Sequence, residues 1–259
     1  MQAVEESIYD HPTYYDLIFG SDWVAEYKFL SAAFDKHVRR KTKRLLEPAC
    51  GTGRLLYRMN KAGYHCEGLD LNPKAVAFCN QRLRRHGYPD LAWVADMCRF
   101  EVARPFDAAF NTINSFRHLL TEAMAANHLR AMASAIRSGG IYALGFHLTP
   151  TVGPTTDEES WTARRGHLQV NTRMWPRDKD PKKRIERFNI QFDIHKPTDS
   201  FRIDDCLVLR SYTYRQFEAL IRKVPEWSIE AAYDFSYEID EPIEIDESTE
   251  DIVYILKRQ

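Results

Sequence analysis

The sequence predicts an α/β fold in which a doubly wound, mainly parallel sheet of seven strands carries an antiparallel insertion after its fifth strand. Three observations lead to this fold class. Short apolar segments alternate with amphipathic segments of helical period between residues 44 and 147, as in a parallel sheet covered on both faces. The later segment RIERFNIQFDIHK alternates between apolar and polar residues, which indicates an antiparallel strand with one wet face. Helical period then returns in TYRQFEALIRKV, and two strand-like segments follow it, WSIEAAYDF and EDIVYILKR.

The first half of the chain contains the clearest elements. Apolar residues at helical spacing predict a helix from Trp23 to Arg40. Five strands are expected after it, at residues 44–47, 64–70, 91–95, 106–112 and 141–146. Helices are expected between them, at residues 54–61, at 73–86 behind an Asn72 cap, and from Thr121 to the Gly139-Gly140 pair. Such helices are the crossover connections that neighbouring parallel strands require.

These elements divide the chain into four expected parts. They are an N-terminal helical cap (1–43), a cofactor-binding core (44–147), an antiparallel insertion or lid (148–211) and a C-terminal completion of the core sheet (212–259). The insertion opens with the polar, proline-rich segment HLTPTVGPTTDEES and is expected to contain about three strands. A small sheet exposes edges that must be covered, so the insertion is a substrate lid, a homodimer contact or both.

Composition limits the class of partner. The 36 basic and 37 acidic residues nearly cancel, so no overall field attracts nucleic acid or a membrane surface. The sequence has no apolar run of membrane-spanning length, and its acidic, aromatic beginning does not resemble a signal peptide. Five scattered cysteines without a C-x-x-C pair favour reduced thiols and no metal site. We therefore expect a soluble, cytoplasmic protein that recognises any partner through a local site.

The strongest local signal is LLEPACGTGRLL, a strand, a glycine turn and a helix in that order. Gly51 and Gly53 have no Cβ, so the backbone can turn sharply and approach a ligand closely. The segment lacks the G-x-x-x-x-G-K-[ST] pattern of nucleoside triphosphate sites. It also lacks the dinucleotide fingerprint, because Leu56 stands where the third glycine would be.

Two carboxylates follow at the ends of the next strands. Asp70 ends the second strand and is placed to hold ribose hydroxyls, the alternative being a cap on the helix that begins near Asn72. Asp96 and Met97 follow the third strand directly. Asp96 can accept a hydrogen bond from the adenine amine while Met97 lies against the ring, the alternative being a loop acid and a core methionine. Together these positions predict an adenosine-bearing ligand.

The strings EPACGTG, GLDLN and ADM, at these separations, resemble the class I S-adenosylmethionine-dependent methyltransferase family, whose fold is Rossmann-like. The resemblance extends from Leu45 to about Phe146. It implies S-adenosylmethionine as cofactor, with residues 47–53 at its methionine part, Asp70 at the ribose, and Asp96 with Met97 at the adenine. One departure is Ala49, where the family usually has glycine, which raises a question about the local turn. The expected cofactor-binding residues are Tyr14, Glu47, Ala49, Cys50, Gly51, Thr52, Gly53, Asp70, Leu71, Asp96, Met97 and Asn111.

Two segments outside the core extend the resemblance. The string Tyr14-Tyr15-Asp16 resembles a tyrosine pair that many small-molecule methyltransferases fold over the active site. The insertion, followed by SYTYRQFEALIRK, is similar in layout to the sugar-amine N-methyltransferases. The expected function is methyl transfer to a small-molecule amine or hydroxyl. The alternatives are a nucleic-acid methyltransferase, which the string NTINSF and the charge balance disfavour, and a non-catalytic adenosyl-ligand-binding protein of the same fold.

The acceptor is expected beside the segment from Asn111 to His118, because ligands sit at the carboxyl ends of parallel strands. His118 is the first catalytic candidate, as a proton acceptor that titrates near neutral pH, the alternative being a packing histidine. Tyr15 is the second, as a lid residue with a hydroxyl, although Tyr14 can take that place and both can simply pack. Asn111 either binds the cofactor or satisfies the loop backbone. Arg117 is expected to be an exposed loop residue.

Overall fold

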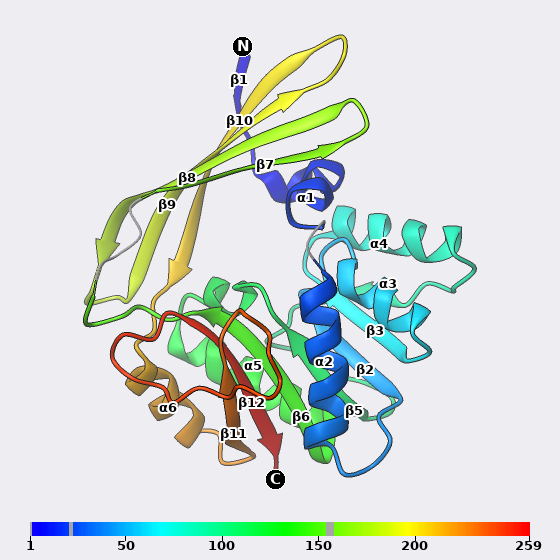
Figure 1. Ribbon diagram of the computed structural model, residues 1–259, viewed down its shortest axis with the longest axis vertical. Helices are drawn as coiled ribbons and strands as arrows, with labels where there is room; N and C mark the ends of the chain where they lie inside the picture. Colours follow the sequence, from blue (N-terminus) through cyan, green and yellow to red (C-terminus); the bar gives the residue numbers. More distant parts are fainter. Residues whose placement is uncertain (1, 21–22, 154–157) are drawn as a thin grey trace.

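The alternating strands and helices of the middle of the chain fold into a seven-stranded sheet covered on both faces (Figure 1). The computed structural model describes residues 2–20, 23–153 and 158–259. The strand order is β11-β12-β6-β5-β2-β3-β4. The bounds are β2 (Arg44–Pro48), β3 (His65–Asp70), β4 (Ala92–Val94), β5 (Phe106–Asn111), β6 (Ile136–His147), β11 (Trp227–Tyr233) and β12 (Asp251–Arg258). Because β12 runs antiparallel to both β6 and β11, the predicted α/β fold is present with a mixed sheet.

Two apolar cores hold the helices to this sheet. One face is covered by α2 (Val24–His37), α3 (Arg54–Lys61) and α4 (Pro73–Arg85), and the other by α5 (Glu122–Ala135) and α6 (Tyr214–Arg222). Leu56 and Cys79 are fully buried in the first core, and Met132 and Phe217 in the second. Burial of an apolar side chain of this size stabilises the fold by about 1.5–3 kcal/mol. The helices leave the carboxyl ends of the parallel strands β2, β3, β4 and β5 uncovered, and we call this side the open edge of the sheet.

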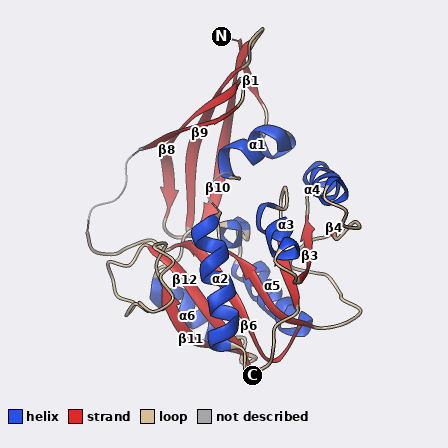
Figure 2. Ribbon diagram, turned by 45° about the vertical axis from the view of Figure 1, so that its right-hand side comes forward, coloured by secondary structure: helices blue, strands red, loops and turns tan. Residues whose placement is uncertain are grey.

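The insertion forms a second sheet above that edge, in the order β1-β10-β9-β8-β7 (Figures 1 and 2). Its strands are β7 (Glu159–Arg165), β8 (Leu168–Asp180), β9 (Ile185–His195), β10 (Ser200–Arg210) and, from the start of the chain, β1 (Gln2–Glu5). The prediction of about three insertion strands missed β7, whose inward residues are only Trp161 and Ala163. It also missed β1, which runs parallel to β10 with Gln2 opposite Phe201, a pairing too distant in sequence to leave a local signal.

The N-terminal segment, expected as a helical cap, is divided between the two sheets. The short 3-10 helix η1 (Ile8–Asp10) and α1 (Pro12–Phe19) pack on the insertion sheet, where Ile8, Leu17 and Ile18 meet Phe192 and Ile203. In contrast, α2 packs on the seven-stranded sheet. The segment therefore connects the two layers rather than capping one of them.

A buried carboxylate ties the layers together. Asp16, on α1, is only 1% exposed. Its Oδ1 accepts a hydrogen bond from the Thr52 hydroxyl at 3.0 Å and pairs with Arg82 of α4 at 2.5 Å. Its Oδ2 pairs with Arg165 of β7 at 3.0 Å. One side chain thus joins α1, the seven-stranded domain and the insertion sheet.

Three smaller results complete the comparison with the predicted elements. Strand β6 begins at Ile136, five residues before the predicted start at residue 141. Ile136 already pairs with Phe106, the first residue of β5. Within the predicted lid segment, residues 154–157 lie outside the described residues. In the described part of the chain, no helix combines the length and the apolar character needed to cross a bilayer.

Candidate active site

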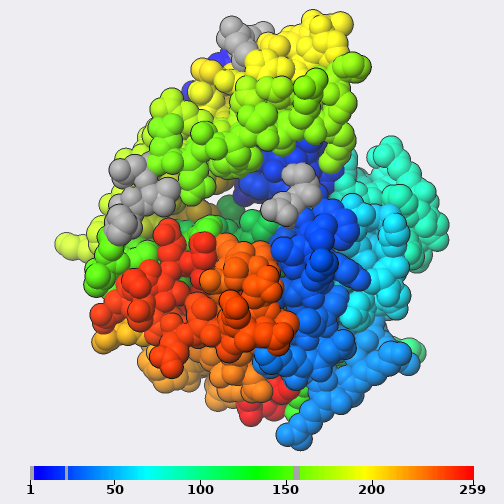
Figure 3. All heavy atoms as spheres, in the orientation of Figure 1, coloured from blue at the N-terminus to red at the C-terminus, as the bar shows by residue number. Residues whose placement is uncertain are grey.

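A cavity of about 930 Å³ lies between the open edge of the seven-stranded sheet and the insertion sheet, with η1 and α1 over it. Figure 3 shows the corresponding hollow between the two layers. The volume is near the upper end of the range of about 300–1,000 Å³ for small-molecule sites, so two ligands fit side by side. We call the part lined by Ala49, Gly51, Thr52 and residues 69–75 and 95–97 the cofactor half. The acceptor half is the part lined by residues 113–115, 117–119 and 147–150 and by the insertion strands.

The predicted glycine turn forms one wall of the cofactor half. Gly51 and Gly53 have φ values of 53° and 71°, in the left-handed region that favours glycine. Ala49 also has a positive φ, 51°, so the departure noted in the sequence is an alanine held in a costly backbone conformation. A Cβ on Gly53 would lie 2.2 Å from the Cys79 Sγ atom. The turn therefore packs too tightly against α4 to accept a side chain there.

Asp70 lies at the end of β3, directly beside this turn. Its Oδ2 accepts a hydrogen bond from the Gly51 N–H and its Oδ1 from the Asn72 N–H, both at 2.8 Å. Burial raises the pKa of the Asp70 carboxyl, and these two N–H groups oppose the shift. The cap of α4 is Asn72, whose side chain accepts from the N–H groups of Lys74 and Ala75. The alternative of Asp70 as the helix cap is thus not what the structure shows.

Two buried acceptors near the turn lack a partner among the described residues. The Oε2 atom of Glu47 and the Oδ1 atom of Asn111 are buried without a hydrogen bond to this part of the chain, at the ends of neighbouring strands β2 and β5. Asn111 donates its own amide to the Pro48 carbonyl at 2.8 Å, which fixes its orientation. Burial raises the pKa of Glu47 well above its usual range. Neither residue lines the cavity, so both belong to the structure that supports its wall.

The loop after β4 forms the far wall of the cofactor half. Asp96 and Met97 both line the cavity, and the Asp96 Oδ1 atom accepts from the Cys98 N–H at 2.8 Å. The Met97 carbonyl lies 2.9 Å from the Nδ1 atom of His128, whose Nε2 atom lies 3.0 Å from the Tyr142 hydroxyl. Burial lowers the pKa of His128 to about 4, so its ring is neutral and Nδ1 donates to the carbonyl. Sequence reasoning missed this support because His128 is an ordinary inward position of α5.

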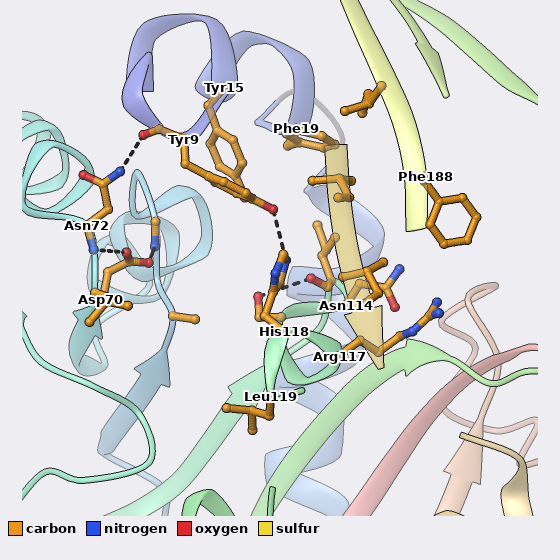
Figure 4. Close-up of a pocket in the computed structure, with 18 of the residues that line it drawn as sticks. Tyr9, Tyr15, Phe19, Asp70, Asn72, Asn114, Arg117, His118, Leu119 and Phe188 are labelled. Atoms are coloured by element: carbon orange, nitrogen blue, oxygen red, sulfur yellow. Dashed lines mark hydrogen bonds between the residues drawn. The ribbon is translucent and has the colours of Figure 1, made fainter. Parts of the chain in front are cut away.

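Between the two halves lies a pair that only the structure reveals. The Tyr9 hydroxyl and the Nε2 atom of His118 form a hydrogen bond of 3.1 Å (Figure 4). The Tyr15 ring packs against Tyr9 with 5.5 Å between centroids. In Figure 4 Asp70 lies on one side of His118, and Arg117 with Phe188 lies on the other. The predicted acceptor-site histidine is therefore at the junction of the two halves.

Burial sets the protonation of this group. It raises the pKa of Tyr15 to about 12 and raises that of Tyr9 further. Burial and the neighbouring Arg117 lower the pKa of His118 below its ordinary value of 6.5. At neutral pH both tyrosines hold their protons, and His118 is uncharged and able to accept one.

The acceptor half contains a buried ion pair. Arg117 donates to Glu186 of β9 and, through Nε, to the Arg210 carbonyl at 3.0 Å. Arg117 is only 4% exposed, so the expectation of an exposed loop residue was wrong. The reason is the insertion sheet, which brings Glu186 over a loop that the sequence alone leaves uncovered.

The structure gathers most of the predicted site residues at the cavity and places the others behind it. Those that line it are Tyr15, Ala49, Gly51, Thr52, Asp70, Leu71, Asp96, Met97 and His118. Outside the lining are Tyr14, Glu47, Cys50, Gly53 and Asn111. Tyr14 faces the insertion sheet, with its ring against Phe201. Among the described residues, no group of three metal-ligating side chains occurs.

Comparisons with known proteins agree with this geometry. Residues 45–140 match the family model described as a methyltransferase domain. A curated relative, the tRNA U34 carboxymethyltransferase of Azotobacter vinelandii, is 26% identical over 127 residues, 49% of this chain and 39% of the relative. The chain spans less than half the length of the curated relatives it matches.

Solved structures share the fold over the whole chain. An S-adenosylmethionine-dependent methyltransferase from Clostridium acetobutylicum superposes with a TM-score of 0.78 and 17% identity, covering 95% of this chain and 96% of that one. The S-adenosylmethionine-bound CalS10, an amino pentose methyltransferase from Micromonospora echinaspora, gives a TM-score of 0.71 and 18% identity over 100% of both chains. At these identities the likeness is one of fold.

Proposed function

We propose that this chain, which carries a methyltransferase domain of the S-adenosylmethionine-dependent family over residues 45–140, transfers a methyl group to an amine or hydroxyl of a small-molecule acceptor. The sequence predicts this family and this cofactor, and the methyltransferase domain match together with the likeness of fold to the S-adenosylmethionine-bound CalS10 supports both. The observation that carries the proposal is the single cavity in which the glycine turn, Asp70 and Asp96 share a space with His118.

The residues of the cofactor half fit the cofactor. Asp70 presents a carboxylate for ribose hydroxyls, and Asp96 with Met97 suits the adenine. Glu47 and Asn111, at the ends of β2 and β5, lie outside the lining, and we assign them to supporting the wall that faces the methionine part. When bound, S-adenosylmethionine would supply a methyl group carried on a sulfonium. The lone pair of an amine or hydroxyl would take that methyl group in line, with S-adenosylhomocysteine as the leaving group. The protein has little covalent chemistry to do, and its main contribution is to hold the acceptor in line and to exclude water.

The chain's own residues provide the proton acceptor. His118 is neutral and lies at the junction of the two halves, and its hydrogen bond to Tyr9 fixes the ring. It can take the proton that an amine or hydroxyl loses, which contributes a factor of about 10² to 10⁴ in general base catalysis. Tyr15 lines the same space with its proton held, so we assign it to positioning by its ring and hydroxyl.

The alternatives fit less well. A nucleic-acid substrate would have to reach His118 beneath α1 and the insertion sheet, in a protein whose net charge is −1. The acceptor is therefore proposed to be small. A cytoplasmic location and a homodimer remain predictions from the sequence.

The test begins with calorimetry of S-adenosylmethionine and S-adenosylhomocysteine on the purified protein. We expect micromolar binding of both, followed by methyl release when amines and alcohols are screened as acceptors. No binding at millimolar ligand contradicts the proposal. Binding without methyl release for any acceptor favours the non-catalytic alternative instead.

A further inference from the structure

The wall of the acceptor half that belongs to the insertion sheet is apolar. Phe188 of β9 pairs with Leu207 of β10 on one side and with Pro176 of β8 on the other, so three apolar residues form a row across the sheet. Met174 and Ile190 form the next inward row, since they are paired in the same register. All five line the cavity. This surface suits an apolar body, because it offers dispersion contact and no hydrogen bonds.

The apolar wall continues on the other sides of the acceptor half. Trp161 of β7 and Phe19 of α1 line it and contact each other, with ring centroids 6.1 Å apart. Leu119 and Leu148 line it from the loops that follow β5 and β6. A polyhydroxylated acceptor would leave hydroxyl groups without hydrogen bonds against this wall, which is costly.

The charges of the acceptor half are unfavourable to an anion. Its lysine and arginine side chains among the described residues are Arg117 and Lys179, and both are paired with Glu186: Arg117 is hydrogen-bonded to it, and the Lys179 Nζ atom lies 3.6 Å from it. This group of three carries one excess positive charge. Two more carboxylates, Glu159 and Glu250, line the cavity at exposed positions. Neither makes an ion pair or side-chain hydrogen bond within the part of the chain that the structure describes. The excess charge is therefore negative, and it attracts cations toward the opening.

We propose that the acceptor is an amine carried on an apolar body, with the body against the Phe188 row and the ammonium group drawn in past Glu159 and Glu250. Phosphorylated and carboxylated molecules are excluded, because the half offers them no unpaired cation. This inference rests on the proposed function and narrows it from amine or hydroxyl to amine. Once inside, the ammonium loses its proton beside His118, the neutral acceptor at the junction.

The test measures binding rather than turnover. Calorimetry on protein saturated with S-adenosylhomocysteine compares phenylbutylamine with phenylbutyrate, which has the same body and the opposite charge, and with glucosamine phosphate, which is an amine on a polar, anionic body. We expect phenylbutylamine to bind at least about tenfold more tightly than either. Equal or tighter binding of phenylbutyrate or glucosamine phosphate overturns the inference, and so does an absence of phenylbutylamine binding at millimolar concentration.

Variants locate the binding. Phe188→Ala should weaken phenylbutylamine binding about tenfold, whereas Asn189→Ala, on the other face of the same strand, should not. Glu250→Gln should weaken it about twofold to fivefold, and Glu244→Gln, which lies in the same loop outside the cavity, should leave it unchanged. Identical effects of the test and control variants contradict the assignment. Retained S-adenosylhomocysteine binding shows that each variant is folded. If the unaltered protein does not bind S-adenosylhomocysteine at all, the proposed function itself is refuted.

Discussion

At the scale of single residues, the site depends on groups whose protonation is set by burial. Asp70 remains an acceptor because two backbone N–H groups offset part of its desolvation. His118 stays neutral because both burial and Arg117 oppose its positive form. Burial raises the pKa of Tyr9 and of Tyr15, so both hydroxyls hold their protons. The cavity thus places an anion at one end and a neutral base at its junction.

Replacement of Asp70 tests the cofactor half. Asp70→Asn removes the charge and keeps the size, but its single oxygen can accept from only one of the Gly51 and Asn72 N–H groups, so ribose binding loses a charged acceptor and the turn loses one of its two hydrogen bonds. We expect the Kd for S-adenosylhomocysteine to rise about tenfold or more in calorimetry. Asp90→Asn, at an exposed ion pair with Arg84, is the control. Unchanged affinity of the Asp70 variant would remove this residue from the site.

Replacement of His118 tests the proton acceptor. His118→Gln should lower kcat about a hundredfold and leave S-adenosylhomocysteine affinity unchanged, because the residue lies outside the cofactor half. Since its pKa is lowered, the protein loses the base only at acidic pH, and the acidic limb of the kcat profile should lie below pH 6.5. That limb should vanish in the variant. An acidic limb that persists unchanged in the variant would contradict the assignment.

At the scale of elements, the parallel core and three strands of the insertion sheet could be predicted from the sequence. The contacts that η1 and the insertion sheet make over the cavity could not. Short apolar strands and capped helices have local signals, which is why β2, β3, β5 and the turn at Gly51 were expected where they lie. The pairing of Tyr9 with His118 joins η1 to the loop after β5, and the burial of Arg117 depends on β9. No local pattern reveals either contact. Ala49 shows the same limit, since its positive φ is imposed by the turn around it.

The contact between α5 and the loop after β4 makes stability depend on pH. Buried His128 has a pKa of about 4 in the folded protein, below its ordinary value of 6.5, so the unfolded chain binds more protons between these values. The free energy of unfolding should therefore fall as pH drops from 6.5 to 4, by up to about 3 kcal/mol. Urea unfolding at pH 7 and at pH 4.5 measures this. His128→Gln should reduce the difference, and an unchanged difference would assign the effect to other groups.

At the scale of the whole molecule, the site exists only where two sheets meet. The seven-stranded sheet supplies the cofactor half, and the insertion sheet with η1 and α1 supplies much of the acceptor half and the cover. Asp16 is one of the polar links between these parts, with partners on Thr52, Arg82 and Arg165. Loss of that link should loosen the cover without unfolding either core.

Replacement of Asp16 tests the link. Asp16→Asn leaves Arg82 and Arg165 without a counter-charge, and both are partly exposed, so we expect a loss of only about 1–3 kcal/mol. Amide hydrogen exchange should become faster in α1 than in α3, and S-adenosylhomocysteine affinity should fall several-fold because α1, which carries Tyr15 over the cavity, is held less firmly. Asp10→Asn, at the exposed pair with Lys74, is the control. Uniform acceleration across all helices would indicate global destabilisation instead.

The parallel pairing of β1 with β10 also dictates an order of assembly during synthesis. Gln2 leaves the ribosome long before its partner Phe201, which is made only after the entire parallel core. Domains fold as they emerge, so the core can fold around its glycine turn while β1 remains unpaired, because β10 does not yet exist. Because η1 and α1 follow β1 directly, the cover over the cavity is completed only after the wall that carries the glycine turn. A segment that is translated before the core is in this way placed after it.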